Sequence, residues 1–244
     1  MAKNKNYRYN ARAKEEEAAR RAAEKKKKTL IAIIAAVLAV VGVAICIAVA
    51  VLASMPKDYC TYYADREIKA DKVTYVEMKI EGYDAPVVIL LDASEAPATV
   101  ENFVGLVERG FYDGLDFHRI IKGFMIQGGD DSHLPKDEQA ETIIGEFESG
   151  GITYNDLLHK RGVISMARAT SVYSASSGFF ICDADAPHLD GDYAAFGYVL
   201  EGLFTVDAIA DYAVGKTDSN GNLLEGYEQP KIEYIKVLDN YVRK

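Results

Sequence analysis

Residues 117–130 read Phe-His-Arg-Ile-Ile-Lys-Gly-Phe-Met-Ile-Gln-Gly-Gly-Asp, and this stretch decides the fold more than any other. Alternation of residue types predicts a strand with Phe117 and Arg119 on one face, and a Lys-Gly turn then leads into a second strand over residues 124–127. A guanidinium beside Phe and Met suits a site that holds an apolar ring and directs hydrogen-bond donors at it. From these residues alone, a buried hairpin with an incidental arginine is the alternative.

The segments that flank this stretch predict many short strands and two helices. Near the start of the region Val76, Met78 and Ile80 recur with period two, which is typical of a strand with one buried face. One helix is predicted after Pro97, which suits a first helical turn, and another over residues 204–213. Further strands are predicted at residues 87–91, 143–147, 162–167, 179–183, 196–199 and 231–238. This mostly β pattern indicates a closed antiparallel barrel with helices covering its open ends.

The first quarter of the chain does not have the composition of a globular domain. Residues 1–28 contain eleven Lys or Arg and four Glu, a net charge of +7; because the whole chain carries −9, residues 29–244 carry −16. Residues 30–53 have no charge, no Pro and no Asn or Gln. As a helix rising about 1.5 Å per residue they would extend roughly 36 Å, enough to cross a hydrocarbon core of about 30 Å. We therefore predict a basic tail over 1–29, a single transmembrane helix over 30–53, a spacer over 54–71 and a globular domain over 72–241.

The charge pattern also predicts an orientation in the membrane. Four lysines, residues 25–28, directly precede the apolar segment, so the positive-inside rule places the N-terminus in the cytoplasm and the acidic domain outside it. A cleaved signal peptide is the alternative, although its apolar region of about 7–15 residues is shorter than this one. A lipid-modified cysteine fits less well, because Cys46 lies in mid-span. An orientation signal explains the basic tail more simply than nucleic acid does, and no nucleic-acid partner is expected.

Four further motifs follow the opening stretch in order. They are Gly162-Val-Ile-Ser-Met-Ala-Arg168, Ser174-Ala-Ser-Ser-Gly-Phe-Phe-Ile181, Leu189-Asp-Gly191 and Phe196-Gly197. Together with residues 117–130, this ordered set resembles the cyclophilin-type peptidyl-prolyl cis-trans isomerases, and bacterial members most, over residues 72–240. The resemblance implies an eight-stranded cyclophilin-like barrel and an enzyme that isomerises X-Pro peptide bonds.

The resemblance also implies roles for individual residues. Arg119 occupies the position of the family's catalytic arginine, and Gln127 that of the residue that hydrogen-bonds the peptide and steadies the arginine. The pocket for the proline ring is implied to consist of Phe124, Met125, Phe180 and Leu189. Ala167 and Arg168 match positions along the substrate groove, and His188 stands where eukaryotic relatives often carry a tryptophan that contacts the ligand.

Some positions depart from the family pattern. Gly178 replaces a glutamine that commonly precedes the two Phe, so one polar contact to the substrate is missing. Tyr193 replaces a histidine, and the polar loop 131–138 replaces a Gly-rich loop. These departures motivate the alternative function, a membrane-tethered module that binds proline peptides with little turnover.

No cofactor and no metal is expected. The four histidines lie far apart and show no ligand spacing, and His118 is predicted to be a structural hydrogen-bonding residue beside Arg119. Residues 218–222 begin like a calcium loop, but glycine stands at position four rather than six, so a tight turn is the better interpretation. The expected partners are proline-containing polypeptides, as exported or surface clients, and the lipid bilayer through residues 30–53. The sequence leaves the oligomeric state open.

Overall fold

The computed structural model of the chain describes residues 20–21, 24–28, 31, 34, 37–39, 41–50, 57–152 and 155–242. They fall in two compact units, residues 1–56 and residues 57–244. In the first unit, residues 41–50 are helical with exposed side chains. Within the described residues we find no helix that combines the length and the apolar character needed to cross a membrane. Parts of the predicted tail (1–29) and of the predicted membrane span (30–53) lie outside the described residues, so both stay predictions.

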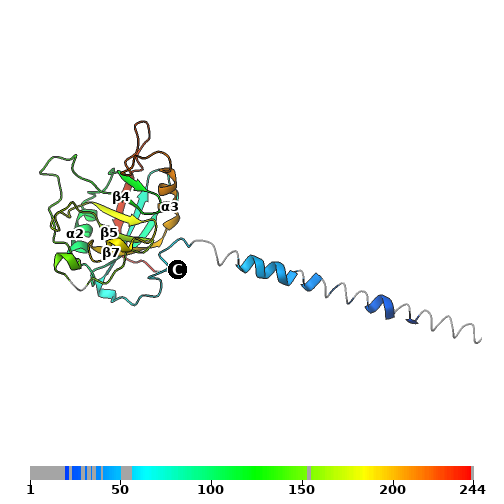
Figure 1. Cartoon of the computed structure of the whole chain (residues 1–244). Helices are drawn as coiled ribbons and strands as arrows, with labels where there is room; N and C mark the ends of the chain where they lie inside the picture. Colours follow the sequence, from blue (N-terminus) through cyan, green and yellow to red (C-terminus); the bar gives the residue numbers. More distant parts are fainter. Residues whose placement is uncertain are drawn as a thin grey trace, which may run out of the picture. The chain divides into compact units, whose positions relative to one another are not determined.

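The second unit is built on one antiparallel sheet. Within the described residues, eight strands pair in the order β3-β4-β6-β5-β7-β2-β1-β8 (Figure 1). Two α-helices and three short 3-10 turns connect them. The elements are η1 (Ala70–Lys72), β1 (Val73–Ile80), β2 (Val87–Asp92), α2 (Pro97–Glu108), β3 (Arg119–Ile121), β4 (Met125–Gly128), η2 (Glu148–Gly150), β5 (Val163–Met166), β6 (Phe179–Cys182), η3 (Pro187–Leu189), β7 (Ala195–Glu201), α3 (Leu203–Tyr212) and β8 (Ile232–Val237).

The sheet curls into an open half-barrel, not the closed barrel that we predicted. β3 and β8 are the two ends of the strand order, and no pairing between them is found in the described residues. The chain before β3 meets the start of β8 through an isolated bridge between Asp116 and Lys231 and through a few backbone hydrogen bonds, such as that from the N–H of Ile232 to the carbonyl of Leu115 (2.8 Å). The backbone N–H of Phe117 donates to the carbonyl of Pro230 (2.9 Å). Pro230 has no N–H to return the bond, so regular pairing does not continue past this residue. The prediction of eight antiparallel strands is confirmed, and the prediction of full closure is wrong.

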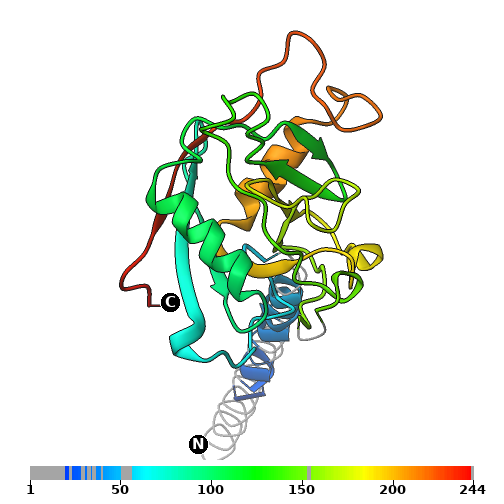
Figure 2. The same cartoon turned by 90° about the vertical axis from the view of Figure 1, so that its left-hand side faces the viewer.

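The inner face of the sheet and the two helices enclose the core. The period-two pattern of β1 is confirmed, because Val76, Met78 and Ile80 are all at most 1% exposed. Helix α2 packs against β8 and β2, and α3 packs against β2, β3 and β4 (Figures 1 and 2). Both helices bury their apolar residues in the same core. An aromatic cluster fills the space beneath α2, where Phe103 contacts the rings of Tyr112, Phe179 and Phe196.

The strand predicted at residues 143–147 is absent from the described fold, and a helix explains why. This segment keeps only one bridge, from Ile143 to Ala175. The buried carboxylate of Glu146 turns inward and accepts hydrogen bonds from the backbone N–H groups of Ala98 (3.1 Å) and Thr99 (2.7 Å). These N–H groups open helix α2 and have no partner within the helix, so a carboxylate there satisfies them and complements the helix dipole. Residues 143–147 therefore provide the cap of α2 and do not pair as a strand.

Part of the predicted spacer is folded. From Lys57 onward the chain lies on the outer face of the sheet, where Cys60 and Tyr63 pack with Val88, Leu90 and Tyr198 in a second apolar cluster. Cys60 is 1% exposed, and its backbone N–H donates to the carbonyl of Val199 (2.9 Å). The compact unit therefore begins at residue 57, ahead of the predicted domain start at 72.

Candidate active site

A row of four side chains crosses four strands on the outer face of the sheet. In the antiparallel register Arg119 of β3 lies opposite Gln127 of β4, Gln127 lies opposite Phe180 of β6, and Phe180 lies opposite Ser165 of β5. Residues directly opposite each other project from the same face of a sheet. Their chain neighbours Ile120, Ile126, Ile164 and Ile181 are buried in the core on the other face. Strand alternation therefore turns the row away from the core.

Two acceptors orient the guanidinium of Arg119. Its Nε donates to the carbonyl of Asn220 (2.7 Å), and its Nη1 donates to Oε1 of Gln127 (3.3 Å). Asn220 is held in the tight turn predicted for residues 218–222, in which the Asp218 carboxylate accepts the backbone N–H groups of Asn220 and Asn222 (both 2.9 Å). An arginine held at two points presents its remaining N–H groups in a fixed direction.

His118 completes the support of Gln127 from behind. Since Oε1 of Gln127 accepts from Arg119, the amide nitrogen faces His118, where Nε2 lies 3.2 Å away. An amide nitrogen can only donate, so this contact requires a neutral imidazole with its proton on Nδ1. Burial lowers the pKa of His118, which favours the neutral form. The predicted structural role of His118 agrees with this arrangement.

Beside the row lies a pocket of about 90 Å³ with an apolar floor. Met125, Phe180 and Leu189 are each at most 8% exposed, so the floor is closed to solvent from below. A five-membered saturated ring matches a pocket of this size and lining, with the Arg119 guanidinium at its edge. The lining residues are Arg119, Phe124, Met125, Gln127, Ala167, Arg168, Phe180, Leu189 and Tyr193.

Aromatic contacts fix the rim of this pocket. The Arg168 guanidinium lies over the ring of Tyr193 (4.5 Å to the centroid) and donates from Nε to the carbonyl of Asp192 (3.0 Å). The Tyr193 ring meets Phe180 edge-on, with centroids 5.9 Å apart. On the other side, the exposed His188 packs against Phe124 at 5.3 Å between centroids. His188 therefore supports the pocket from outside and does not line it.

A second hollow of about 300 Å³ continues the site past Gln127 and Arg168. It shares Gln127, Ala167 and Arg168 with the first pocket, so an extended peptide can occupy both. Its other lining residues are mostly small or polar: His118, Asp130, Asp131, Ala169, Ser174, Ser176, Ser177 and Gly178. The absent side chain of Gly178 leaves part of this hollow open.

Comparison with known proteins identifies the family. The family model described as cyclophilin type peptidyl-prolyl cis-trans isomerase/CLD matches residues 75–235. The chain belongs to this family. A peptidyl-prolyl cis-trans isomerase of Helicobacter pylori is 38% identical over 149 residues, 60% of this chain and 86% of that protein. One of Acinetobacter baylyi is 38% identical over 144 residues, 57% of this chain and 72% of that protein.

A solved structure supports the assignment. The crystal structure of a Cryptosporidium parvum cyclophilin type peptidyl-prolyl cis-trans isomerase in the presence of the dipeptide Ala-Pro has a TM-score of 0.54 and 27% identity. The match covers 68% of this chain and 99% of that one. The predicted recognition as a cyclophilin-type isomerase, and with it the prediction of an enzyme, is confirmed.

The cyclophilin site gathers most of the predicted residues and one that was not predicted. Eight of the nine predicted residues line the pocket, and His188 lies behind Phe124. The ring of Tyr193 also lines the pocket, although the sequence predicts no role for it beyond a departure from the family pattern. Tyr193 follows the Leu189-Asp-Gly191 motif by two residues, and this position could have indicated a role in the pocket.

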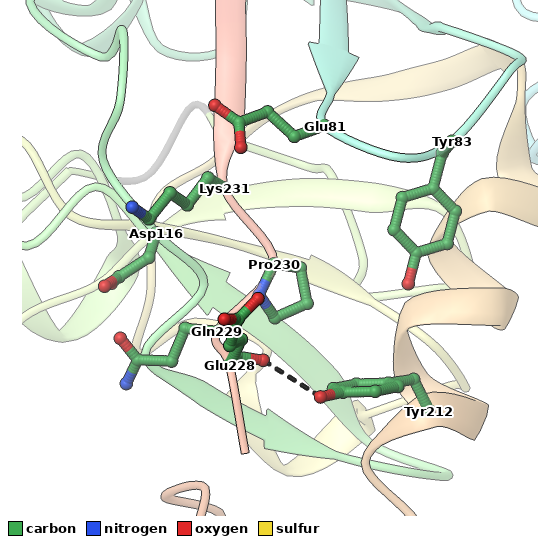
Figure 3. Close-up of a pocket in the computed structure, with 8 residues that line it drawn as sticks. All are labelled: Glu81, Tyr83, Asp116, Tyr212, Glu228, Gln229, Pro230 and Lys231. Carbon is green, nitrogen blue, oxygen red and sulfur yellow. Dashed lines mark hydrogen bonds between the residues drawn. The ribbon is translucent and has the colours of Figure 1, made fainter. Parts of the chain in front are cut away.

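A further hollow of this cyclophilin, of about 450 Å³, has a different character (Figure 3). It is lined by Glu81, Asp116, Glu228 and Lys231 together with the phenols of Tyr83 and Tyr212, and by Gln229 and Pro230. The Tyr212 hydroxyl donates to the carbonyl of Glu228 (3.1 Å). None of these residues lines the isomerase pocket, and a charged lining does not suit an apolar ring.

Two histidines, one partly and one fully buried, make stability depend on pH. Burial lowers the pKa of His118 and of His159, and Asp190 partly opposes the shift at His159. The unfolded chain then binds protons more readily than the folded one, so the free energy of unfolding should fall as the pH drops below about 6.5, the ordinary histidine value. Denaturant titrations from about pH 8 to about pH 5 measure this slope. His159→Asn should flatten it, and an unchanged slope in that variant would contradict the assignment.

Proposed function

We propose that this isomerase holds the proline ring of an X-Pro segment in the pocket of Met125, Phe180 and Leu189 and stabilises the twisted peptide bond with Arg119. Rotation about the bond faces a barrier of about 18–20 kcal/mol because it breaks amide resonance. In the twisted state the prolyl nitrogen becomes pyramidal and gains a lone pair. A donor directed at that nitrogen stabilises the transition state more than the planar ground state, which is the condition for catalysis.

The observation that carries this mechanism is the cross-strand row Arg119, Gln127 and Phe180. Among the residues that the structure describes, the guanidinium donates only to Asn220 and Gln127, so further N–H groups remain for a ligand. Gln127 holds it from the neighbouring strand, and Phe180 forms the floor on the next strand. In this scheme Arg119 and Gln127 act on the reacting bond, and Phe124, Ala167 and Arg168 border the peptide. The related Cryptosporidium crystal structure was determined in the presence of the dipeptide Ala-Pro, which supports a proline-containing peptide as the ligand.

The proposal includes a membrane anchor and extracytoplasmic clients. Its support is the uncharged segment 30–53 preceded by residues 25–28, all lysine, and the contrast between +7 in residues 1–28 and −16 in the rest. With the N-terminus in the cytoplasm, the isomerase unit would act on exported or surface proteins. No cofactor or metal enters this scheme.

Labelling in intact cells tests the orientation. Cys60 is buried and its pKa is raised by burial, so it is a poor reporter. Thr61 beside it is exposed. A membrane-impermeant maleimide should modify Thr61→Cys in intact cells, whereas Lys14→Cys in the tail should react only after lysis. Labelling of Lys14→Cys but not of Thr61→Cys in intact cells would exclude the proposed orientation. Labelling of both variants in intact cells would mean that no membrane separates the two positions.

Gly178 and the polar loop 131–138 favour a second candidate, a module that binds proline peptides with little turnover. Two-dimensional NMR exchange on an X-Pro peptide separates the two functions. Cross-peaks between cis and trans resonances that grow with protein concentration would indicate turnover. Line broadening without exchange cross-peaks would indicate binding alone.

Adding the missing amide should tighten peptide binding. Gly178 does not have a positive φ, and an added Cβ would meet Ala167 Cβ at 3.4 Å, an ordinary contact. We expect Gly178→Gln to lower the peptide Kd about two- to tenfold, the value of one additional hydrogen bond. Gly178→Ala adds the Cβ without the amide and serves as the control in the same titration. Equal affinities for the two variants would mean that the amide finds no partner.

A further inference from the structure

A short segment ahead of the family match lies across the outer face of the sheet. We call residues 57–68 the strap; the family model begins only at residue 75. At one end the Asp58 carboxylate accepts the backbone N–H of Gly202 (3.1 Å), and the Asp58 carbonyl accepts that of Leu203 (3.0 Å). At the other end Arg66 forms an ion pair with Glu95. The strap is thus fixed to the start of α3 and to the loop before α2.

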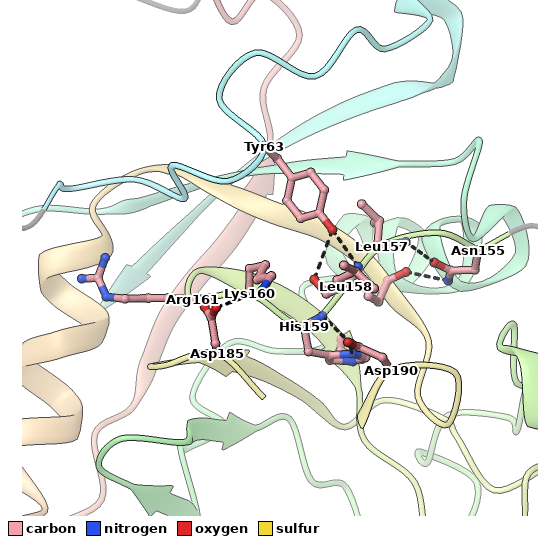
Figure 4. A network of polar contacts seen from close by, with 11 residues as sticks. Tyr63, Asn155, Leu157, Leu158, His159, Lys160, Arg161, Asp185 and Asp190 are labelled. Carbon is pink, nitrogen blue, oxygen red and sulfur yellow. Dashed lines mark hydrogen bonds and ion pairs between the residues drawn. The ribbon is translucent and has the colours of Figure 1, made fainter. Parts of the chain in front are cut away.

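Tyr63 fastens the strap to the loop of residues 155–161. Its ring is 4% exposed and stacks on Tyr198 with centroids 5.1 Å apart. The hydroxyl oxygen accepts the backbone N–H of Leu158 (2.6 Å), and the hydroxyl proton is donated to the carbonyl of the same residue (3.2 Å). One phenol therefore fixes both backbone polar groups of Leu158 (Figure 4).

The strap holds this loop at a second point through Glu95. One oxygen of the Glu95 carboxylate is paired with Arg66, and the other accepts the backbone N–H of Asp156 (2.6 Å). The glutamate is 7% exposed, so salt screens its ion pair with Arg66 only weakly. Two strap residues, Tyr63 and Arg66, thus restrain the loop at Leu158 and Asp156.

His159, the next residue of the loop, points the other way, toward Asp190 (Figure 4). Its ring is 1% exposed, with Nδ1 2.9 Å from an oxygen of Asp190 and Nε2 3.0 Å from Oγ of Ser165. The ring lies nearly parallel to that of Phe180, at 17° and 5.9 Å between centroids. The residue that follows the Tyr63 contact thus packs against Phe180, which forms the floor of the isomerase pocket.

We infer that Tyr63 is a positioning residue of the isomerase: through Leu158 and His159 it sets the place of Phe180, and hence of the proline ring relative to Arg119. The inference rests on the proposed role of Phe180 as the pocket floor. Buried side chains transmit a shift because the interior is close-packed. A misplacement of about 1 Å at a reacting group can cost about 10²-fold in rate, so a smaller shift of the floor has a measurable effect.

The test compares two tyrosines that are neighbours in the strap, using the full chain in mild detergent. Tyr63→Phe keeps the ring on Tyr198 and removes both hydrogen bonds to Leu158. Tyr62→Phe changes an exposed ring (57% exposed) and is the matched control. We expect Tyr63→Phe to lower kcat/KM about three- to tenfold and to shift the imidazole 15N and 1H resonances of His159, with neither change in Tyr62→Phe.

Glu95→Gln gives a second, independent arm if Tyr63→Phe does not fold. It removes the ion pair with Arg66 and should shift the His159 resonances in the same direction, with a smaller loss of kcat/KM. Equal kcat/KM for both tyrosine variants and the wild type would overturn the inference. So would a loss explained entirely by the unfolded fraction while the His159 signals stay in place, because the strap would then only stabilise the fold. Full activity in Arg119→Ala would contradict the proposed role of Arg119. The comparison of Tyr63→Phe with Tyr62→Phe would still test the inference about Tyr63.

Discussion

Replacing Arg119 with alanine is expected to lower kcat/KM for X-Pro isomerisation by roughly two to three orders of magnitude, the usual cost of removing one donor to a developing lone pair. The guanidinium is held by Asn220 and Gln127 and borders the pocket, so its loss removes the donor without emptying the apolar floor. Peptide affinity should change much less than the rate, because the proposed donor acts mainly in the twisted state. Rates from NMR exchange, combined with a Kd from titration, separate the two quantities.

Two further arginine variants sharpen this prediction. Arg119→Lys retains the charge but loses the planar fork that contacts two acceptors at once, so it should restore little of the rate. Arg109 lies exposed at the end of α2, where its Nε donates to the carbonyl of Gly105 (3.3 Å), and Arg109→Ala should behave as wild type. A wild-type rate in Arg119→Ala would rule out the proposed mechanism.

Replacing Phe103 with alanine is expected to reduce the free energy of unfolding by about 3–5 kcal/mol, because a buried ring is removed and a cavity remains. The ring is fully buried, and its centroid lies 5.0 Å from that of Tyr112, 5.6 Å from Phe179 and 5.2 Å from Phe196. Three rings that face one position cannot all move to fill the space. Denaturant titration near neutral pH measures the loss.

Phe204 provides the control for this substitution. It stands in the first turn of α3 with 49% of its surface exposed, and Phe204→Ala should cost less than about 1 kcal/mol because little area returns to water. Similar losses for the two variants would mean that the aromatic cluster does not carry the stability assigned to it.

The sequence predicts those elements best whose burial follows a simple period. In β1 every second residue from Val76 to Ile80 is buried, and in α3 Val206, Ile209 and Ala210 form one apolar stripe, so both elements are found close to where they were expected. Residues 143–147 were also predicted as a strand, yet Glu146 turns inward to cap α2. A local sequence pattern cannot predict that Glu146 caps a helix, because that helix begins almost fifty residues earlier in the chain.

For the candidate site, too, the sequence predicts contacts within one hairpin but not contacts between segments that are far apart in the chain. Arg119 and Gln127 belong to one hairpin, so their proximity follows from the sequence. Their alignment with Phe180 and Ser165 depends on the order β3-β4-β6-β5, in which strands that are not consecutive become neighbours. His159 carries no motif, and only the folded chain brings its ring against that of Phe180. The strap has a polar, mixed composition typical of a linker, and its packing depends on the surface offered by Tyr198 and Leu90.

Because Arg119, Gln127 and Phe180 project outward from the sheet, residues that contact the peptide and residues that form the core occupy alternate positions on the same strands. On the same strands, the residues next to them in the chain, Ile120, Ile126 and Ile181, belong to the interior. Peptide preference can therefore change by substitution at alternate positions while the residues that hold the sheet together stay the same. A lineage of duplicated copies could acquire different clients through replacements at the exposed rim of the site, without change to the interior residues of the same strands.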